Sequence, residues 1–339
     1  MIDWLDLRVP GCDLPVDAGK VVSFSSHGEI EWQTMKRLPV EGSHCATVTL
    51  RQTPLGLLVS GNPSKWFQGH NLFGTDDLQS LVPAFLLSIF DRVGYVPPVH
   101  ERFSILRGVV QLTRLDTTQS YDLGNQSRAI AFVQALSQVS RLRHRGAGSI
   151  LKEGTCYWRQ GSRRMSAKAY CKGLELKAHP IPGTVPEYER LSHLALGLVR
   201  LEFTLRSMWL KHEGLDLVCN WPIIGATPEC IHARLLSGLN IAEAEMIDTT
   251  VIEGLPPRYQ LAYEAWLAGK DMRRMFSRNT FYVYRRALLA HGIDISIKRP
   301  SPPVSNVVRI RPILEAVPVG VPDWARGTSL YYEPQAVAA

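Results

Sequence analysis

The sequence lacks the features of a membrane-spanning, secreted or disulfide-stabilised protein. No apolar run approaches the roughly 18 residues that a membrane span requires. The first residues, MIDWLDLRVPG, carry acids where a secretory signal would carry basic residues, so we expect no targeting segment and a cytoplasmic protein. The six cysteines are scattered and form no Cys-x-x-Cys pair, which predicts neither a disulfide framework nor a zinc site.

Acidic residues are scarce in one part of the chain. The 339 residues, 45% of them hydrophobic, are enough for about two domains with a substantial core. The formal net charge is +7, and residues 251–311 contain eleven Lys and Arg against four Asp and Glu. The positive excess therefore lies in one C-terminal module, which favours a polyanionic partner for that module.

Strand-like and helix-like patterns alternate over the first 210 residues. A strand is predicted over 2–8, antiparallel strands broken by turns are predicted within 22–32 and 44–63, and 103–121 is predicted as one long strand or a strand pair. Helices are predicted over 76–93 and 126–142. Between them, GNPSKWFQGHNLFG (61–74) is interpreted as a structured turn with a buried Trp and Phe, with a loop close to nucleic acid as the alternative. This order predicts an α+β fold around an antiparallel sheet.

The densest set of reactive side chains lies between residues 154 and 207. A short strand around Tyr157 is followed by a predicted hairpin partner over 165–176, a helix over 187–198 and a strand over 199–206. On a regular strand Lys168, Tyr170 and Lys172 share one face. Glu175 would fall on the opposite face unless a bulge at Gly173 redirects it.

A faint internal repeat links two of the predicted strands. Arg114-Leu115-Asp116-x-Thr118 is similar to Arg200-Leu201-Glu202-x-Thr204, and each motif places a carboxylate in mid-strand. Chance is one explanation. The other is a core of two similar halves, about 1–100 and 101–210, with Asp116 and Glu202 at related positions.

The basic C-terminal module has its own helical pattern. Helices are predicted over 258–268, 271–276 and 278–290, the last with Ser277 as its N-cap, and a strand is predicted over 293–297. This is the order of a winged helix-turn-helix. We therefore divide the chain into 1–250, 251–311 and a tail over 312–339, which we expect to be poorly ordered.

Six segments together resemble one known family. They are IDWLDL, GNPSKWFQGHNLFG, TRLDTTQSYDL, TCYWRQGSRRMSAKAYCKGLELKAH, LVRLEFTLRS and AWLAGKDMRRMFSRNTFYVYRRALLAHGIDI. Over roughly residues 1–300 the chain resembles the replication initiators of filamentous phages and related plasmids, the gene II/X family. The resemblance implies that residues 1–250 form a nicking and joining domain similar to rolling-circle initiator nucleases.

The resemblance also implies an activity. Such an enzyme nicks one strand of duplex phage DNA at the origin, frees a 3′-hydroxyl, and later cuts and rejoins the displaced strand. Rolling-circle initiators use a tyrosine that becomes joined to the 5′-phosphate, together with a divalent cation, Mg²⁺ or Mn²⁺. Many carry a His-hydrophobic-His metal motif, which does not occur in this sequence. Carboxylates would then supply the metal ligands, since Mg²⁺ prefers oxygen donors.

The resemblance and the strand faces together suggest roles for individual residues. Tyr170 is the candidate nucleophile, because a nearby cation favours the phenolate of a group whose pKa is ordinarily ~10. Lys168 and Lys172 are its candidate activators, and Tyr188 and Tyr157 are alternative nucleophiles. The candidate metal ligands are Asp116, Glu202, Glu175 and His179. The candidate DNA-binding residues are Arg114, Arg163, Arg164 and Arg200 near the site, and Arg278, Asn279, Tyr282, Arg285 and Arg286 on the capped helix.

The expected partners are the origin duplex and the displaced single strand in a bacterial host. The host replication helicase and polymerase are candidate partners, and an oligomer on the origin is an open alternative. A different class of function also remains open at this point: a non-catalytic phage DNA-binding regulator with the same fold. Metal-dependent nicking of an origin plasmid would separate the two.

Overall fold

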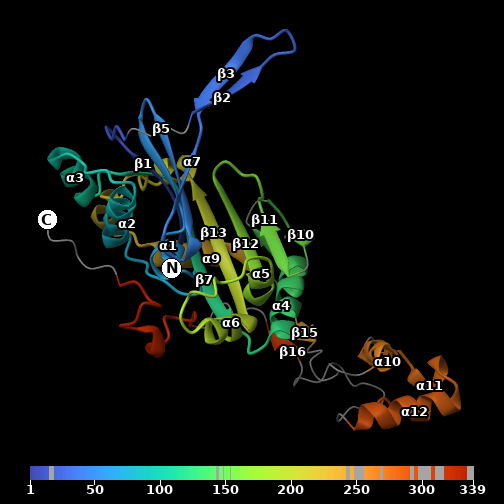
Figure 1. Cartoon of the computed structure of the whole chain (residues 1–339). Helices are drawn as coiled ribbons and strands as arrows, with labels where there is room; N and C mark the ends of the chain where they lie inside the picture. Colours follow the sequence, from blue (N-terminus) through green and yellow to red (C-terminus); the bar gives the residue numbers. More distant parts are fainter. Residues whose placement is uncertain are drawn as a thin grey trace.

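The largest element of the fold is a nine-stranded antiparallel sheet. The computed structural model describes residues 1–14, 19–142, 145–147, 149–152, 154–241, 245–247, 256–267, 270–290, 294–296, 307–309 and 317–333. The strand order is β10-β11-β12-β13-β7-β1-β6-β5-β4 (Figure 1). The strands are β1 (Ile2–Val9), β4 (Leu38–Glu41), β5 (Thr47–Thr53), β6 (Gly56–Gly61), β7 (Gln111–Asp122), β10 (Ser149–Lys152), β11 (Thr155–Trp158), β12 (Met165–Cys171) and β13 (Leu198–Arg206).

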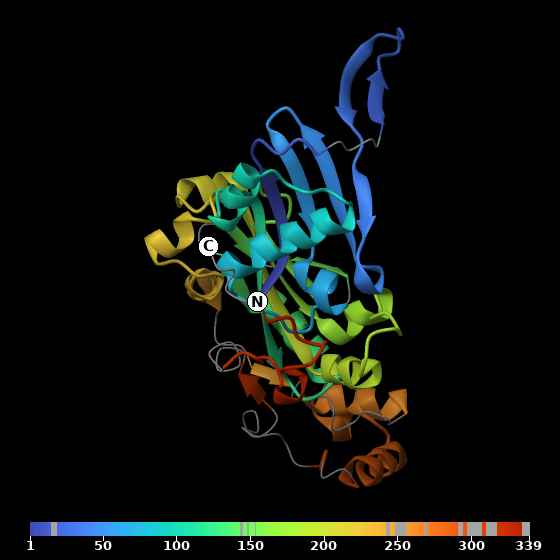
Figure 2. The ribbon, with the colours of Figure 1, turned by 60° about the vertical axis from the view of Figure 1, so that its left-hand side comes forward.

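Smaller β elements surround this sheet. The hairpin of β2 (Lys20–Phe24) and β3 (Ile30–Met35) projects away from the body of the molecule (Figures 1 and 2). A three-stranded sheet joins β8 (Ser140–Leu142), β9 (Arg145–Ala147) and β14 (Leu239–Ile241). A two-stranded sheet pairs β15 (Glu245–Ile247) with β16 (Val307–Arg309).

Helices pack on one face of the large sheet, which we call the apolar face. They include α2 (Leu78–Arg92), α4 (Gln126–Val139), α7 (Ser207–His212) and α9 (Pro228–Ser237). Leu5, Leu115 and Phe203 project from this face and are fully buried. The Phe203 ring meets the His232 ring of α9 edge-on, with centroids 4.9 Å apart. Alternation then turns the intervening residues of β1, β7 and β13 to the other side.

We call that other side the polar face. It bears Trp4, Asp6, Arg114, Asp116, Lys168, Tyr170, Arg200 and Glu202. At one end it is covered by the segment 69–75, by α5 (Lys172–Ala178) and α6 (Tyr188–Leu196), and by the C-terminal segment 317–333 (Figures 1 and 2). Towards the other end its side chains remain partly exposed, so the sheet presents a polar surface beside a covered site.

The motif at 61–74 folds as the structured turn that its composition predicts. Asn62 caps α1 (Pro63–Gln68) by accepting a hydrogen bond from the Lys65 amide, and Gly69 ends the helix in the left-handed region (φ 78°). Trp66 and Phe73 are both buried.

Two strand predictions are wrong in part. The segment predicted as a long strand or a strand pair over 103–121 begins inside a helix, α3 (Val99–Leu106), which buries Ile105 and is followed by Gly108 in the left-handed region (φ 70°). The strand predicted over 165–176 ends at Cys171, where α5 begins. In both cases an apolar run is shared between a strand and a helix, and alternation over so few residues cannot locate the junction.

The C-terminal module contains three helices around a small core of its own. They are α10 (Pro257–Leu267), α11 (Met272–Met275) and α12 (Arg278–Leu289). Their core includes Tyr263, Phe281 and Leu288, and the Ser277 hydroxyl caps α12 by accepting from the Thr280 amide, as predicted. Of the predicted strand 293–297, residues 294–296 form a turn and the others lie outside the described residues. The three helices are present, therefore, but the described part of that segment is not a wing strand.

The described part of the tail, residues 317–333, does not follow the prediction of poor order; residues 312–316 and 334–339 lie outside the described residues. Residues 317–333 pack against α6 and the segment 69–75 in a second hydrophobic cluster that contains Phe73, Leu191 and Leu330. The Phe67 and Tyr332 rings stack with centroids 3.9 Å apart, and the Leu330 carbonyl lies 2.9 Å from His70 Nε2. The burial of aromatic and aliphatic side chains thus holds this part of the tail against the body of the protein despite its Pro and Gly content. Within the described ranges, no helix is long and apolar enough to span a membrane.

Candidate active site

Strand register brings the central candidates together on the polar face. Across β12 and β13, Lys168 lies opposite Glu202 and Tyr170 lies opposite Arg200. Across β13 and β7, Glu202 lies opposite Thr118. Directly opposed residues project to the same side of a sheet, so the predicted nucleophile and a predicted ligand are neighbours. The alternation predicted for 199–206 is confirmed, although Arg200 and Glu202 are buried rather than solvated.

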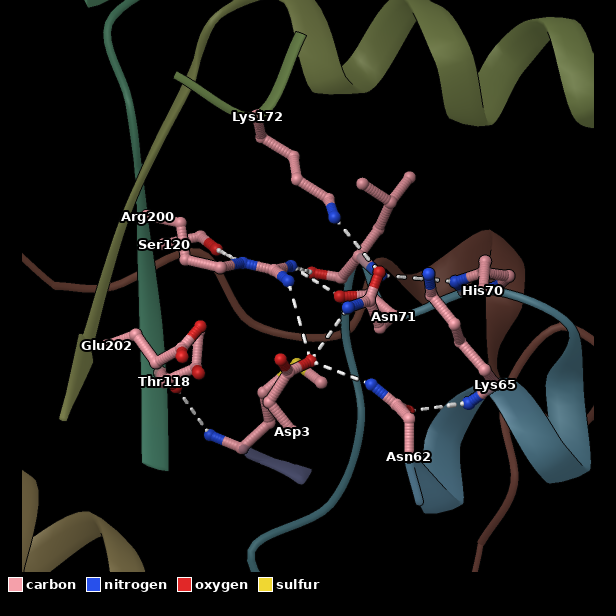
Figure 3. Close-up of polar contacts among 12 residues, drawn as sticks. Asp3, Asn62, Lys65, His70, Asn71, Thr118, Ser120, Lys172, Arg200 and Glu202 are labelled. Atoms are coloured by element: carbon pink, nitrogen blue, oxygen red, sulfur yellow. Dashed lines mark hydrogen bonds and ion pairs between the residues drawn. The ribbon is translucent and has the colours of Figure 1, made fainter. Parts of the chain in front are cut away.

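A β-bulge adds a carboxylate that the sequence pattern hides. Strict alternation would put Asp3 on the apolar face with Leu5. The register of β1 against β7 shifts between Ile2 and Trp4, and Asp3 Oδ1 lies 3.7 Å from Arg200 Nη1 and accepts from Asn62 and Asn71 (Figure 3). A bulge commonly redirects a side chain in this way.

Three carboxyl groups, Asp3, Asp116 and Glu202, influence one another at this point. Burial raises the pKa of Glu202, as do the negative charges of Asp116 and Asp3, while the ion pair with Lys168 (2.9 Å) opposes the rise. Burial also raises the pKa of Asp116, although Arg114 holds both of its carboxylate oxygens. Burial alone would raise the pKa of Asp3, but Arg200, Lys172 and Asn71 hold it below its ordinary value.

Two buried oxygens at the centre have no hydrogen-bond partner among the residues that the structure describes. They are Glu202 Oε2 and Thr118 Oγ1, on directly opposed residues of β13 and β7. A buried acceptor without a partner is costly, which makes this pair the natural position for a bound ion, water or substrate oxygen. Within the described ranges, however, no group of three or more His, Cys, Asp or Glu side chains is arranged to hold a metal ion by itself.

Tyr170 is covered rather than solvated, with only 6% of its surface exposed. Burial raises its pKa well above the ordinary value, and the nearby positive charge of Arg200 opposes that rise. The Lys168 ammonium lies 5.0 Å from the centroid of the Tyr170 ring. Lys168 itself is paired with Glu202, so in this state the two lysines do not flank the hydroxyl as the strand pattern predicted.

Asn71 connects the other buried charges. Its Oδ1 accepts from Lys172 Nζ at 2.9 Å, its Nδ2 donates to Asp3 at 2.8 Å, and its carbonyl accepts from Arg200 (Figure 3). Burial and the Arg200 charge lower the pKa of Lys172 to about 7. Sequence reasoning missed Asp3. It considered Asn71 only as one polar residue of a loop close to nucleic acid, and missed that Asn71 joins the buried charges of the site.

The remaining predicted ligands come from α5 rather than from the strands that carry Asp116 and Glu202. Glu175 is in the first turn of α5, where its carboxylate accepts from Lys172 Nζ at 2.6 Å, and no bulge at Gly173 is involved. His179 is exposed at the C-terminal end of the same helix. Asp116 and Glu202 are therefore the two predicted ligands that the fold brings together.

The alternative nucleophiles and the nearby arginines have different settings. Tyr157 is on β11, directly opposite Lys168 of β12. Tyr188 is the first residue of α6, and 40% of its surface is exposed. Arg163 and Arg164 are exposed in the turn between β11 and β12. Of the three tyrosines, Tyr170 alone lies directly opposite Arg200.

The repeated motif occupies symmetry-related positions. Thr117 pairs with Phe203 across the antiparallel strands β7 and β13. A local twofold axis through this pair relates Asp116 to Glu202 and Arg114 to Arg200, the same correspondence that the sequence motif suggested.

The C-terminal candidates divide into two groups. Arg278, Asn279, Tyr282 and Arg286 are exposed on α12. Arg285 instead donates two hydrogen bonds to Asp294, at 2.7 and 2.6 Å, and so ties the helix to the turn that follows it.

Comparison with known proteins places the chain in a family. A family model for the N-terminal region of the phage replication-associated protein encoded by gene II matches residues 1–223, and the model for its C-terminal region matches residues 255–335. The replication-associated protein of Enterobacteria phage I2-2 is 31% identical over 333 residues, which cover 95% of each chain. That of Enterobacteria phage M13 is 28% identical over 176 residues, 47% of this chain and 42% of the relative. That of Salmonella phage IKe is 25% identical over 222 residues, 58% of this chain and 51% of the relative. The chain belongs to the gene II family of phage replication-associated proteins.

Proposed function

We propose that this protein is a rolling-circle replication initiator that nicks and rejoins DNA at a phage origin through a covalent bond between Tyr170 and a 5′-phosphate. The observation that carries the proposal is the convergence of Tyr170, Arg200, Glu202 and Asp116 on one face of three adjacent strands. The relatives' name, replication-associated protein, supports the biological setting.

The covalent step balances with groups of this chain. Tyr170 Oη bonds to phosphorus, the bond from phosphorus to the 3′-oxygen breaks, and the strand leaves with a 3′-hydroxyl. Lys172 is the candidate acceptor of the tyrosine proton, because its lowered pKa, about 7, leaves part of it neutral at neutral pH. Its amine contacts Asn71 and Glu175 in this structure, so the transfer requires the amine to turn towards the Tyr170 hydroxyl. The protonated amine then returns the proton to the leaving 3′-oxygen. Arg200 would stabilise the negative charge that develops beside it. Attack by a 3′-hydroxyl on the tyrosyl phosphodiester reverses the reaction and joins the strand.

A divalent cation, Mg²⁺ or Mn²⁺, would be held by Glu202 and Asp116. The unpartnered Glu202 Oε2 and the hard oxygen donors of the pair fit such an ion. Two carboxylates are fewer ligands than a closed protein site needs, but Mg²⁺ is commonly bound by one or two carboxylates together with substrate phosphate oxygens and waters. When bound, the ion would polarise the phosphoryl group.

Metal-dependent nicking tests this function. The substrate is a supercoiled plasmid that carries the origin of the genome encoding the chain, and the product is the relaxed circle on a gel. Wild type should nick with Mg²⁺ or Mn²⁺ and not with EDTA. Tyr170→Phe should reduce nicking to the EDTA level, and Glu202→Gln should weaken the response to metal.

Tyr157→Phe and Tyr188→Phe are the matched controls and should retain nicking. If Tyr170→Phe nicks as wild type does, the nucleophile is wrong. If no metal supports nicking by wild type while origin DNA is still bound, the protein is instead the non-catalytic DNA-binding regulator.

The origin-binding role of the C-terminal module is part of the same proposal. Arg278, Asn279, Tyr282 and Arg286 form the exposed side of α12 that would enter the major groove. The remaining candidate, Arg285, forms an ion pair with Asp294 and is therefore not part of the proposed DNA-binding surface.

A further inference from the structure

Arginine side chains gather on the polar face beyond the carboxylates. Arg206 on β13 lies directly opposite Arg114 on β7, and its amide donates to the carbonyl of Arg164 at the start of β12. Further along, Arg8 on β1 and Arg51 on β5 both lie opposite Leu58 of the intervening strand β6. By strand register, Arg206 and Arg114 thus form one row across the sheet, and Arg8 and Arg51 form a second.

Most of this positive charge is not neutralised. In the described part of the chain, neither Arg51 nor Arg206 has an ion-pair partner, and Arg8 donates to the neutral side chain of Gln111. The Nε atoms of Arg8 and Arg206 are buried and find no hydrogen-bond partner within the described ranges. A buried donor that lacks an acceptor is unfavourable, so these arginines are arranged to receive an anionic ligand.

Trp4 lies beside the carboxylate Asp116, one step along the sheet from the level of Arg114 and Arg206. It is opposite Asp116 on β7, and Arg8 follows it four residues along β1, about 13 Å away at the rise of a strand. Its indole nitrogen donates to Asp6 at 2.8 Å, which fixes the orientation of the ring. Trp4 is partly exposed, and the Arg114 guanidinium lies over its ring, 5.6 Å from the centroid, so a fixed aromatic ring that carries a cation on one side borders the site.

We propose that this part of the polar face binds a single strand of DNA, with Arg8, Arg51 and Arg206 on phosphates and Trp4 against a base. The proposal rests on the proposed function and names the form of the substrate at that site. A single strand fits better than a duplex for two reasons. Tyr170 is only 6% exposed, so a phosphate must reach it on a flexible strand. Stacking on an aromatic side chain requires an unpaired base.

Binding measured without metal separates this surface from the chemistry. The full chain is titrated in EDTA, at several salt concentrations, against a fluorescein-labelled oligonucleotide of the origin strand and against the same sequence as a duplex. The test variant is Arg8→Gln/Arg51→Gln/Arg206→Gln. The matched control removes three charges from the helical side, Arg102→Gln/Arg107→Gln/Lys211→Gln, and a lysine version of the test variant retains the charge.

The test variant should bind the single strand about 10- to 100-fold more weakly than the control, with a salt slope smaller by about 2, since each lost phosphate contact removes about 0.7. Duplex binding should change less, and the lysine version should recover most of the affinity. Trp4→Leu should weaken single-strand binding about 5- to 100-fold with an unchanged salt slope.

Two results would overturn the assignment: single-strand binding by the test variant within about twofold of the control, or equal losses for single strand and duplex. Thermal unfolding of both triple variants establishes that any loss is not a folding defect. If wild type fails to nick but the test variant still loses single-strand binding, the proposed function fails and the surface stands. If nicking is confirmed and binding does not change, only the surface fails.

Discussion

Replacing Lys172 by methionine should change how the stability of the protein depends on pH. Lys172 is fully buried, and burial together with Arg200 lowers its pKa from 10.5 to about 7. Between about pH 7 and 10 the unfolded chain carries a proton on this amine that the folded chain lacks, so unfolding takes up a proton. Raising the pH in this window therefore stabilises the folded wild-type protein, and the effect is lost below the folded pKa.

The magnitude follows from the size of the shift. One pH unit within the window corresponds to about 1.4 kcal/mol in the free energy of unfolding, and the whole shift to about 3–5 kcal/mol. The methionine side chain that replaces the amine cannot titrate. The difference between wild type and Lys172→Met should therefore increase by about 2–3 kcal/mol between pH 7.5 and 9.5, in favour of wild type.

Urea unfolding of both proteins at several pH values measures this difference, and other titrating groups cancel in the comparison. Lys177→Met, on the exposed side of the same helix, is the control for the loss of a lysine side chain. A difference for Lys172→Met that stays constant within about 0.5 kcal/mol would refute the reasoning, because the buried amine would then titrate as it does in the unfolded chain.

Two further predictions concern the covering of the site. Gly69→Ala should lower the free energy of unfolding by about 2–4 kcal/mol, because the new Cβ would lie 2.6 Å from Val185 Cγ2 at a φ of +78°. The control, Gly161→Ala, has a φ of +75° and open space around it, so it should cost about 1 kcal/mol from the backbone alone. Equal costs in chemical unfolding would contradict the packing at Gly69. Leu330→Ala should cost about 2–5 kcal/mol and speed amide exchange in residues 69–74, while Val317→Ala, which is 91% exposed in the same segment, should change neither. Unchanged exchange in Leu330→Ala would show that the tail does not hold the segment of Asn71.

The parts of the site that sequence could predict are those on regular strands. Alternation over 199–206 assigned Glu202 and Arg200 to one face because β13 pairs without a register shift along its whole length. The same period applied to β12 placed Lys168 and Tyr170 together, and the repeated motif placed Asp116 near Glu202. The assignments on β12 and β13 need only the two-residue period of a strand, and the assignment of Asp116 needs only the repeated motif.

The parts that could not be predicted depend on irregular backbone or on distant segments. Asp3 reaches the polar face through a bulge, which a pattern of alternating residues does not reveal. Glu175 belongs to a helix that begins only after Cys171. Asn71 acquires its role because a loop about 100 residues earlier in the chain passes over Lys172 and Arg200. The tail was misjudged because Pro and Gly content says nothing about the aromatic contacts it makes.

The central claim is that Tyr170 becomes joined to DNA, and peptide mapping tests it most directly. The wild-type protein is allowed to cleave an origin oligonucleotide with Mg²⁺ or Mn²⁺, the covalent complex is digested with a protease, and the peptide that carries the nucleotide is sequenced by mass spectrometry. We predict that the modified residue is Tyr170. A nucleotide attached to Tyr188 or Tyr157 would contradict the claim.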